Sequence, residues 1–141
     1  MSELTEVTLV IHCHNPPAVA GTQFNGVRLG IQFGKEVIED VVVDGADVLF
    51  RAPIRLKQLP DGSPDFAGPY VQGPRDERFV YLNWGYRHLS AWTGVRRAKL
   101  QLRDLPRELL SQPEVHVWVD MTDAKGGPLC ASVKSGNLRW G

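Results

Sequence analysis

Leu9-Val10-Ile11-His12-Cys13-His14 is the stretch that decides the fold of this chain. Within it the apolar Leu9, Ile11 and Cys13 alternate with the other three residues. Successive side chains of a β-strand point to opposite faces of the sheet, so this period of two is typical of a half-buried strand. The stretch therefore predicts a strand with one face in the core and both histidines on the other face.

The same alternation recurs along the chain. It appears at 27–33, 48–57, 97–102 and 114–121, and further strands are expected at 35–43, 78–84 and 128–134. Turn-forming residues separate these segments, for example Asp44-Gly45 and Pro60-Asp61-Gly62. Pro53 cannot donate a ladder hydrogen bond, so it predicts that its part of the strand is an edge or a bulge.

One short helix is expected near 105–112, within a segment from Asp104 to Gln112 where Pro106 occupies a first turn. Seven or eight strands and one short helix predict an all-β fold, either an antiparallel β-sandwich or a small β-barrel. A length of 141 residues fits a single domain over 1–141.

Composition excludes several classes of protein. The hydrophobic share is 43% and the charged share 23%, both ordinary for a soluble globular domain. The formal net charge of +0 argues against a nucleic-acid binder, which normally carries a strong positive excess. The sequence contains no apolar run of membrane-spanning length, and early acidic residues replace the basic start of a signal peptide. A cytoplasmic protein without a cofactor is expected.

The two cysteines, Cys13 and Cys130, each lie in an apolar, strand-like run. Buried free thiols behave mainly as small hydrophobic groups, and that role is the expectation for both. A disulfide or a reactive thiol is the alternative.

The zero net charge conceals an uneven distribution. Residues 35–50 have a net charge of −4, and residues 75–107 have a net charge of +5. Pairing between these segments on a solvated surface is one interpretation. The other is a patch facing an anion, because the guanidinium fork of arginine suits carboxylate and phosphate groups.

Several segments, read in order, resemble one protein family. They are Pro16-Pro17, residues 30–35, the segment 65–74 that includes Gly68-Pro69-Tyr70-Val71-Gln72-Gly73-Pro74, residues 78–81, residues 92–100, and residues 125–134. On these segments the sequence resembles DUF5990, a mainly bacterial family of unknown function, from about residue 7 to Trp140. The resemblance implies a small single-domain protein, and it brings no activity, cofactor or catalytic residue.

His12 and His14 are the candidates for a metal site, since imidazole suits zinc and copper. A third ligand would have to come from another strand, for instance His116 or Asp120 on an outer face. Nothing in the sequence completes such a site, so we expect no bound metal and a pair of surface histidines.

The strongest candidate for a ligand site combines aromatic and basic residues. The set comprises Tyr70, Gln72, Arg78, Tyr81, Trp92, Arg96 and Arg97. Tyrosine, tryptophan and arginine are common anchors of binding surfaces, because they join a large contact area to a polar group. Core aromatics with a cation–π contact between strands are the alternative interpretation of the same residues.

These observations favour a β-domain that binds a small molecule or a protein partner in a groove lined from 65–97. Neither nucleic acid nor membrane is an expected partner. A small cofactor-independent enzyme, such as an isomerase, cyclase or hydrolase with a cleft there, is one alternative. A structural homodimer formed through the sheet face that carries His12, His116 and Trp118 is another.

Overall fold

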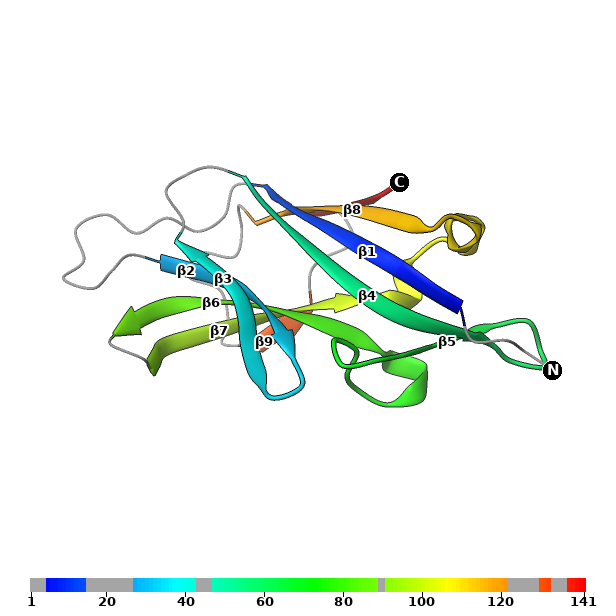
Figure 1. Cartoon of the computed structure of the whole chain (residues 1–141), viewed down its shortest axis with the longest axis horizontal. Helices are drawn as coiled ribbons and strands as arrows, with labels where there is room; N and C mark the ends of the chain where they lie inside the picture. Colours follow the sequence, from blue (N-terminus) through cyan, green and yellow to red (C-terminus); the bar gives the residue numbers. More distant parts are fainter. Residues whose placement is uncertain (1–4, 15–26, 43–46, 89–90, 122–129, 133–136) are drawn as a thin grey trace.

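Two five-stranded sheets pack face to face in the computed structural model of the chain (Figure 1). The structure describes residues 5–14, 27–42, 47–88, 91–121, 130–132 and 137–141. Its strands are β1 (Thr5–His14), β2 (Val27–Phe33), β3 (Glu36–Val42), β4 (Val48–Gln58), β5 (Pro64–Ala67), β6 (Phe79–His88), β7 (Ala91–Gln101), β8 (Glu114–Asp120), β9 (Cys130–Ser132) and β10 (Leu138–Trp140). The expected all-β fold is thus confirmed, and it takes the form of two layered sheets.

The first sheet has the order β10-β8-β1-β4-β5 and is called the β1 sheet below. The second has the order β3-β2-β6-β7-β9 and is called the β6 sheet. Most neighbouring strands are antiparallel, but among the described strands β1 with β8 and β7 with β9 pair in parallel. Parallel neighbours require long connections, and both pairs are indeed far apart in the sequence.

The core lies between the sheets and follows from the alternation along the strands. Leu9, Ile11 and Cys13 of β1 are fully buried, and they pack in one cluster with residues such as Leu82 of β6 and Leu100 of β7. Burial of a leucine- or isoleucine-sized side chain contributes roughly 1.5–3 kcal/mol, so this cluster holds the two layers together. The outer face of β1 remains available for polar residues.

The expected helix near 105–112 is a 3₁₀ turn instead. The 3₁₀ helices are η1 (Arg75–Glu77), η2 (Leu102–Asp104) and η3 (Arg107–Ser111). Pro106 precedes η3 and Pro113 follows it closely, so only one short helical run fits between them. A proline also disfavours helical backbone at the residue before it, which explains why no regular α-helix forms here.

Pro53 occupies a position of β4 that, among the described strands, is paired on one side only. Thr8, opposite Pro53, directs its N–H to the carbonyl of Pro113 on the β8 side. Two residues opposite each other in an antiparallel ladder either exchange both backbone hydrogen bonds or exchange none. The backbone nitrogen of Pro53 therefore also points away from β1. β5 pairs only with residues from Arg55 onward, so β4 is an open edge at Pro53, as its missing N–H requires.

β6 and β7 extend beyond the segments expected from the sequence, and their pairing shifts between Trp84 and Tyr86. Gly85 lies at this shift, where an irregular pairing interrupts the simple alternation of side chains.

Among the described residues no helix has the length and apolar character needed to cross a membrane.

Candidate functional site

The outer face of the β1 sheet carries a row of side chains brought together by strand register. Leu49 of β4 pairs with His12 of β1, His12 with Trp118 of β8, and Trp118 with Arg139 of β10. These four residues are called the aromatic row. They come from four segments of the chain, and the two sheet pairings on either side of β1 place them beside one another.

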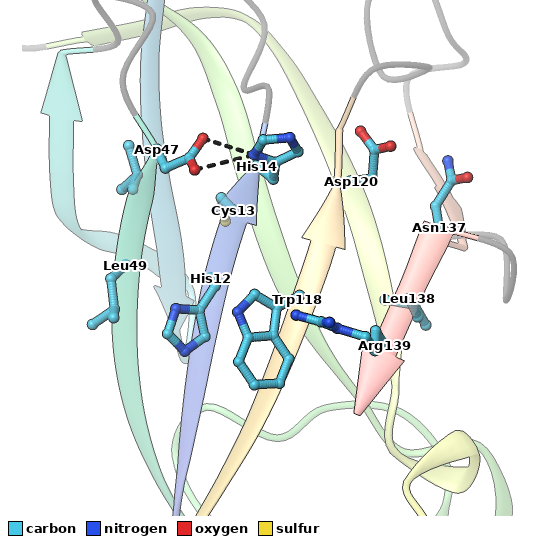
Figure 2. A pocket seen from close by; sticks show the side chains of 11 residues that line it. His12, Cys13, His14, Asp47, Leu49, Trp118, Asp120, Asn137, Leu138 and Arg139 are labelled. Carbon is cyan, nitrogen blue, oxygen red and sulfur yellow. Dashed lines mark hydrogen bonds and ion pairs between the residues drawn. The ribbon is translucent and has the colours of Figure 1, made fainter. Parts of the chain in front are cut away.

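Trp118 lies at the centre of the aromatic row and is flanked on both sides. The rings of His12 and Trp118 are nearly parallel, with centroids 4.8 Å apart and an interplanar angle of 12°. The Arg139 guanidinium carbon lies 4.4 Å from the Trp118 ring centre, a cation–π distance. Because β1 and β10 flank β8 on opposite sides, His12 and Arg139 lie on opposite sides of Trp118 (Figure 2).

His12 is hydrogen-bonded to His116, and His116 lies at ion-pair distance from Glu114. His12 Nε2 lies 2.8 Å from His116 Nδ1, and His116 Nε2 lies 3.5 Å from Glu114 Oε1. Glu114 also accepts a 2.8 Å hydrogen bond from Arg51. An ionised carboxylate only accepts, so His116 carries its proton on Nε2 and its Nδ1 accepts from His12 Nε2–H.

This order leaves Nδ1 of His12 as a hydrogen-bond acceptor. No partner of that nitrogen lies within hydrogen-bonding distance among the described residues. Burial lowers the pKa of His12 below 6.5, and the neighbouring His116, Arg51 and Arg139 lower it further. At neutral pH the imidazole is therefore neutral, and its unprotonated Nδ1 can receive a donor from a bound molecule.

A second row of polar side chains lies next to the aromatic row. His14 pairs with Asp120 in the β1–β8 ladder, and its Nδ1 lies 3.0 and 3.1 Å from the carboxylate oxygens of Asp47 (Figure 2). The hydrogen bond and charge of Asp47, with a smaller contribution from Asp120, raise the pKa of His14 above 6.5. The His14 side chain is 56% exposed, so bulk solvent screens this ion pair.

A pocket of about 580 Å³ opens over both rows. Its lining residues are His12, Cys13, His14, Asp47, Val48, Leu49, Trp118, Asp120, Asn137, Leu138 and Arg139. Figure 2 shows the labelled lining residues on β4, β1, β8 and β10 and on the segments next to these strands. Leu49 keeps 47% of its surface exposed, which is unusual for a leucine in a sheet and gives the pocket an apolar wall.

Cys13 lines the pocket from the core side and is buried as a free thiol. Burial raises its pKa to about 12, and the charge of Asp47 adds to the shift. The thiol is thus protonated at neutral pH and is a poor nucleophile. This confirms the expected hydrophobic role of Cys13, whereas the side chain of Cys130 lies outside the described residues.

His12 and His14 do not converge on a common point, although both lie on the outer face. His12 is bonded to His116, and His14 is bonded to Asp47. Within the part of the chain that the structure describes, no group of three or more histidine, cysteine, aspartate or glutamate residues is arranged to hold a metal ion. The geometry thus gives these histidines partners within the protein.

The sequence profile of DUF5990, described as a family of unknown function, matches residues 7–141. The chain belongs to this family. No curated protein matches the chain, and no solved structure matches it either. The resemblance expected from the sequence is confirmed, and the chemistry of this DUF5990 protein has to be argued from its own residues.

Two of the segments that carry the family resemblance contact each other. The N–H of Gly34 donates to the carbonyl of Pro69 at 2.8 Å, and Gln72 Nε2 donates to the carbonyl of Gly34 at 2.8 Å. The ring of Tyr70 is buried and meets Phe33 edge to face at 5.0 Å. In this DUF5990 protein, Tyr70 and Gln72 therefore attach the β2–β3 turn to the loop after β5.

The other predicted site residues lie elsewhere in the fold. Arg78 precedes β6 and donates to the carbonyl of Gly73, and its Nε lies 4.0 Å from the carboxylate of Asp65. Arg97 of β7 lies over the Tyr81 ring of β6 at 5.8 Å and donates to Asn83 at 3.1 Å. This is a cation–π contact between strands, the alternative weighed for these residues.

Trp92 and Arg96 lie on β7, opposite Arg87 and Trp84 respectively, and their side chains fall outside the described residues. The side-chain hydrogen bonds of Gln72, Arg78 and Arg97 thus go to Gly34, Gly73 and Asn83 respectively. Ligand binding by this set stays a prediction. Sequence reasoning missed Asp47, Leu49 and Arg139, because only strand register brings them beside His12 and Trp118.

Proposed function

We propose that this protein binds a small molecule in the pocket on the outer face of the β1 sheet. We propose further that the ligand carries a protonated amine next to an apolar body. One observation supports this most directly: the pocket joins two carboxylates, Asp47 and Asp120, to an exposed leucine and the edge of a stacked aromatic row.

The amine end of the ligand follows from the acceptors in the pocket. Above the raised pKa of His14, where both histidines are neutral, the lining has two carboxylates, Asp47 and Asp120, against one cation, Arg139. Nδ1 of His12 adds a neutral acceptor whose protonation state is fixed by His116 and Glu114. An ammonium group has three donors and no acceptor, so it suits this combination better than an anion does.

The apolar part follows from the aromatic row. The Trp118 ring is already stacked with His12 and in contact with Arg139, so we place the ligand beside the indole rather than on it. The ligand lies instead on the exposed Leu49 side chain and on the outer edges of the rings. Pockets for small molecules commonly combine an apolar wall with a few fixed polar groups, and this arrangement has both.

Binding of phenethylamine tests the proposal, with phenylacetate as the matched probe of opposite charge. Calorimetric titration at constant ionic strength is expected to show weak, roughly millimolar binding of the amine, which is about −4 kcal/mol. Asp120→Asn is expected to weaken amine binding by roughly tenfold or more, since a hydrogen bond to a charged group contributes about 1.5–3 kcal/mol. Glu36→Gln removes an exposed carboxylate from the β6 sheet and is the control.

Tighter binding of phenylacetate than of phenethylamine would refute the amine assignment. Equal loss of affinity in Asp120→Asn and Glu36→Gln would show only a general charge effect. Light scattering on the same samples addresses the homodimer alternative, in which Leu49→Asp converts a dimer to a monomer. For the enzyme alternative, the described lining contains no serine or threonine, and the Cys13 thiol is protonated.

A further inference from the structure

A second pocket, of about 330 Å³, lies beside the three 3₁₀ helices and shares no lining residue with the first. Its lining residues are Leu59, Ser63, Pro64, Phe66, Arg75, Asp76, Arg78, Leu102, Arg103, Leu105 and Arg107. Four arginines thus face one aspartate in the lining. All four belong to the basic segment 75–107 recognised in the sequence.

These guanidinium groups have few partners within the protein. Among the described residues the four make a single hydrogen bond, from Arg78 to the carbonyl of Gly73. The nearest carboxylates are at ion-pair rather than hydrogen-bond distance: Arg75 to Asp65 at 3.5 Å, Arg78 to Asp65 at 4.0 Å, and Arg103 to Glu77 at 3.9 Å. The group therefore retains most of its donor capacity.

The lack of partners within the protein is clearest for two of the arginines. Arg78 Nε is buried without a hydrogen-bond partner, as is Oδ1 of Asp65, although a buried polar atom normally has one. Arg107 has no carboxylate within 4.0 Å among the described residues, and it acts on Asp61 only through longer-range charge. Three of the four arginines have only these long ion pairs and Arg107 has none among the described residues, so a bound anion would offset the repulsion between the cations.

The floor of the pocket is apolar. Phe66, Leu102 and Leu105 are buried core residues that also line it. The guanidinium fork matches the paired oxygens of phosphate and sulfate, and hydrogen bonds between ionised partners are roughly twice as strong as neutral ones. We infer that this pocket binds a tetrahedral oxyanion of the phosphate or sulfate type, carried by a small organic body that rests on this floor.

Titration with phenyl phosphate, orthophosphate and phenol tests this inference at constant ionic strength with chloride as the background anion. Phenyl phosphate is expected to bind and phenol is not. Binding of phenyl phosphate about tenfold tighter than orthophosphate assigns the site to an organic phosphate, whereas equal affinity assigns it to the free anion. Arg103→Gln and Arg107→Gln are each expected to lower phosphate affinity about tenfold, and Arg107→Lys to restore part of it, since lysine keeps the charge but not the fork.

Arg55→Gln provides the matched control. Arg55 is exposed on the outer face of the β1 sheet, on the side away from the core. Thermal melting of each variant separates a loss of binding from a loss of folding. If Arg103→Gln unfolds, Arg107→Gln alone decides, since the Arg107 side chain makes no ion pair in the described structure. Absence of phosphate binding at about 10 mM, or equal weakening by Arg55→Gln, overturns the inference.

Discussion

Replacing Gly73 with alanine is expected to destabilise the protein by far more than the same change at Gly62. Both glycines have positive φ, +91° at Gly73 and +86° at Gly62, so an added Cβ meets the same type of backbone strain at each. Their surroundings differ. A Cβ at Gly62 would have nothing within 4 Å, whereas one at Gly73 would lie 2.6 Å from Phe79 Cε1 and 2.7 Å from the carbonyl oxygen of Glu77.

The magnitudes follow from these two contributions. Left-handed backbone costs an L-residue roughly 1–2 kcal/mol. Loss of glycine's freedom in the unfolded chain offsets this by about 0.4–1 kcal/mol. Gly62→Ala is thus expected to lower the free energy of unfolding by about 1 kcal/mol or less. Gly73→Ala carries an additional cost of roughly 1–3 kcal/mol, because the backbone around Glu77 or the Phe79 ring must move.

Urea denaturation of both variants beside the unchanged protein measures the difference directly. We expect Gly73→Ala to be the less stable variant by roughly 1–3 kcal/mol, with a similar dependence on urea concentration. Gly73 also supplies the carbonyl that accepts from Arg78, so phosphate binding in the second pocket should weaken along with stability. Equal destabilisation by the two substitutions would refute the steric argument, and would leave only the shared backbone effect.

Three further outcomes follow from the first pocket. Asp47→Asn should lower the pKa of His14 toward 6.5 in an NMR titration. Because the native pair raises this pKa, the stability that the pair contributes is present below the pKa of His14 in the unfolded chain and is lost as the pH rises through its pKa in the folded protein. An unchanged pKa would contradict the hydrogen bond between Asp47 and His14. His116→Ala should raise the pKa of His12 toward 6.5, as measured from the ring protons of His12 in the NMR titration. A further decrease of this pKa would exclude repulsion from His116 as one of its causes. Cys13, with a pKa of about 12, should react with a thiol reagent roughly a hundredfold more slowly in the folded protein than in urea. Mass spectrometry of the labelled peptide measures both rates. Equal rates would show that the thiol is accessible in the folded protein.

Much of the fold was predictable because burial on one face of a strand leaves a direct trace in the sequence. The alternation at residues 9–14 predicts β1 and correctly places Leu9, Ile11 and Cys13 in the core. The short strands β5 and β10 leave no such trace, since each has few residues over which a period of two can show. The 3₁₀ turn after Pro106 was predicted as a helix because its local residues do suit a helix, and only the short distance to Pro113 prevents one.

The candidate site was less predictable, because it depends on which strands are neighbours. Alternation alone places His12, His116 and Trp118 on outer faces, as the homodimer alternative assumed. It does not show that β1 and β8 pair in parallel with His12 beside Trp118. The loop residues Tyr70 and Gln72 resemble binding residues in composition, but in the structure they contact the β2–β3 turn. Residue type indicates the interactions a side chain can make, and register determines which partner it finds.

The net charge of zero conceals an acidic segment of net −4 and a basic segment of net +5, and each of the two pockets draws charged residues from only one of them. Asp47 belongs to the acidic segment 35–50 and lies just before β4, in the first pocket. Leu59 lies just after β4 and lines the second pocket, which carries the four arginines. β4 has 11 residues, and at about 3.3 Å per residue the two ends are separated by roughly 35 Å. That exceeds the screening length of about 8 Å at physiological ionic strength, so neither pocket cancels the field of the other. A neutral protein of this size can therefore offer one site for a cation and another for an anion, which the total charge conceals.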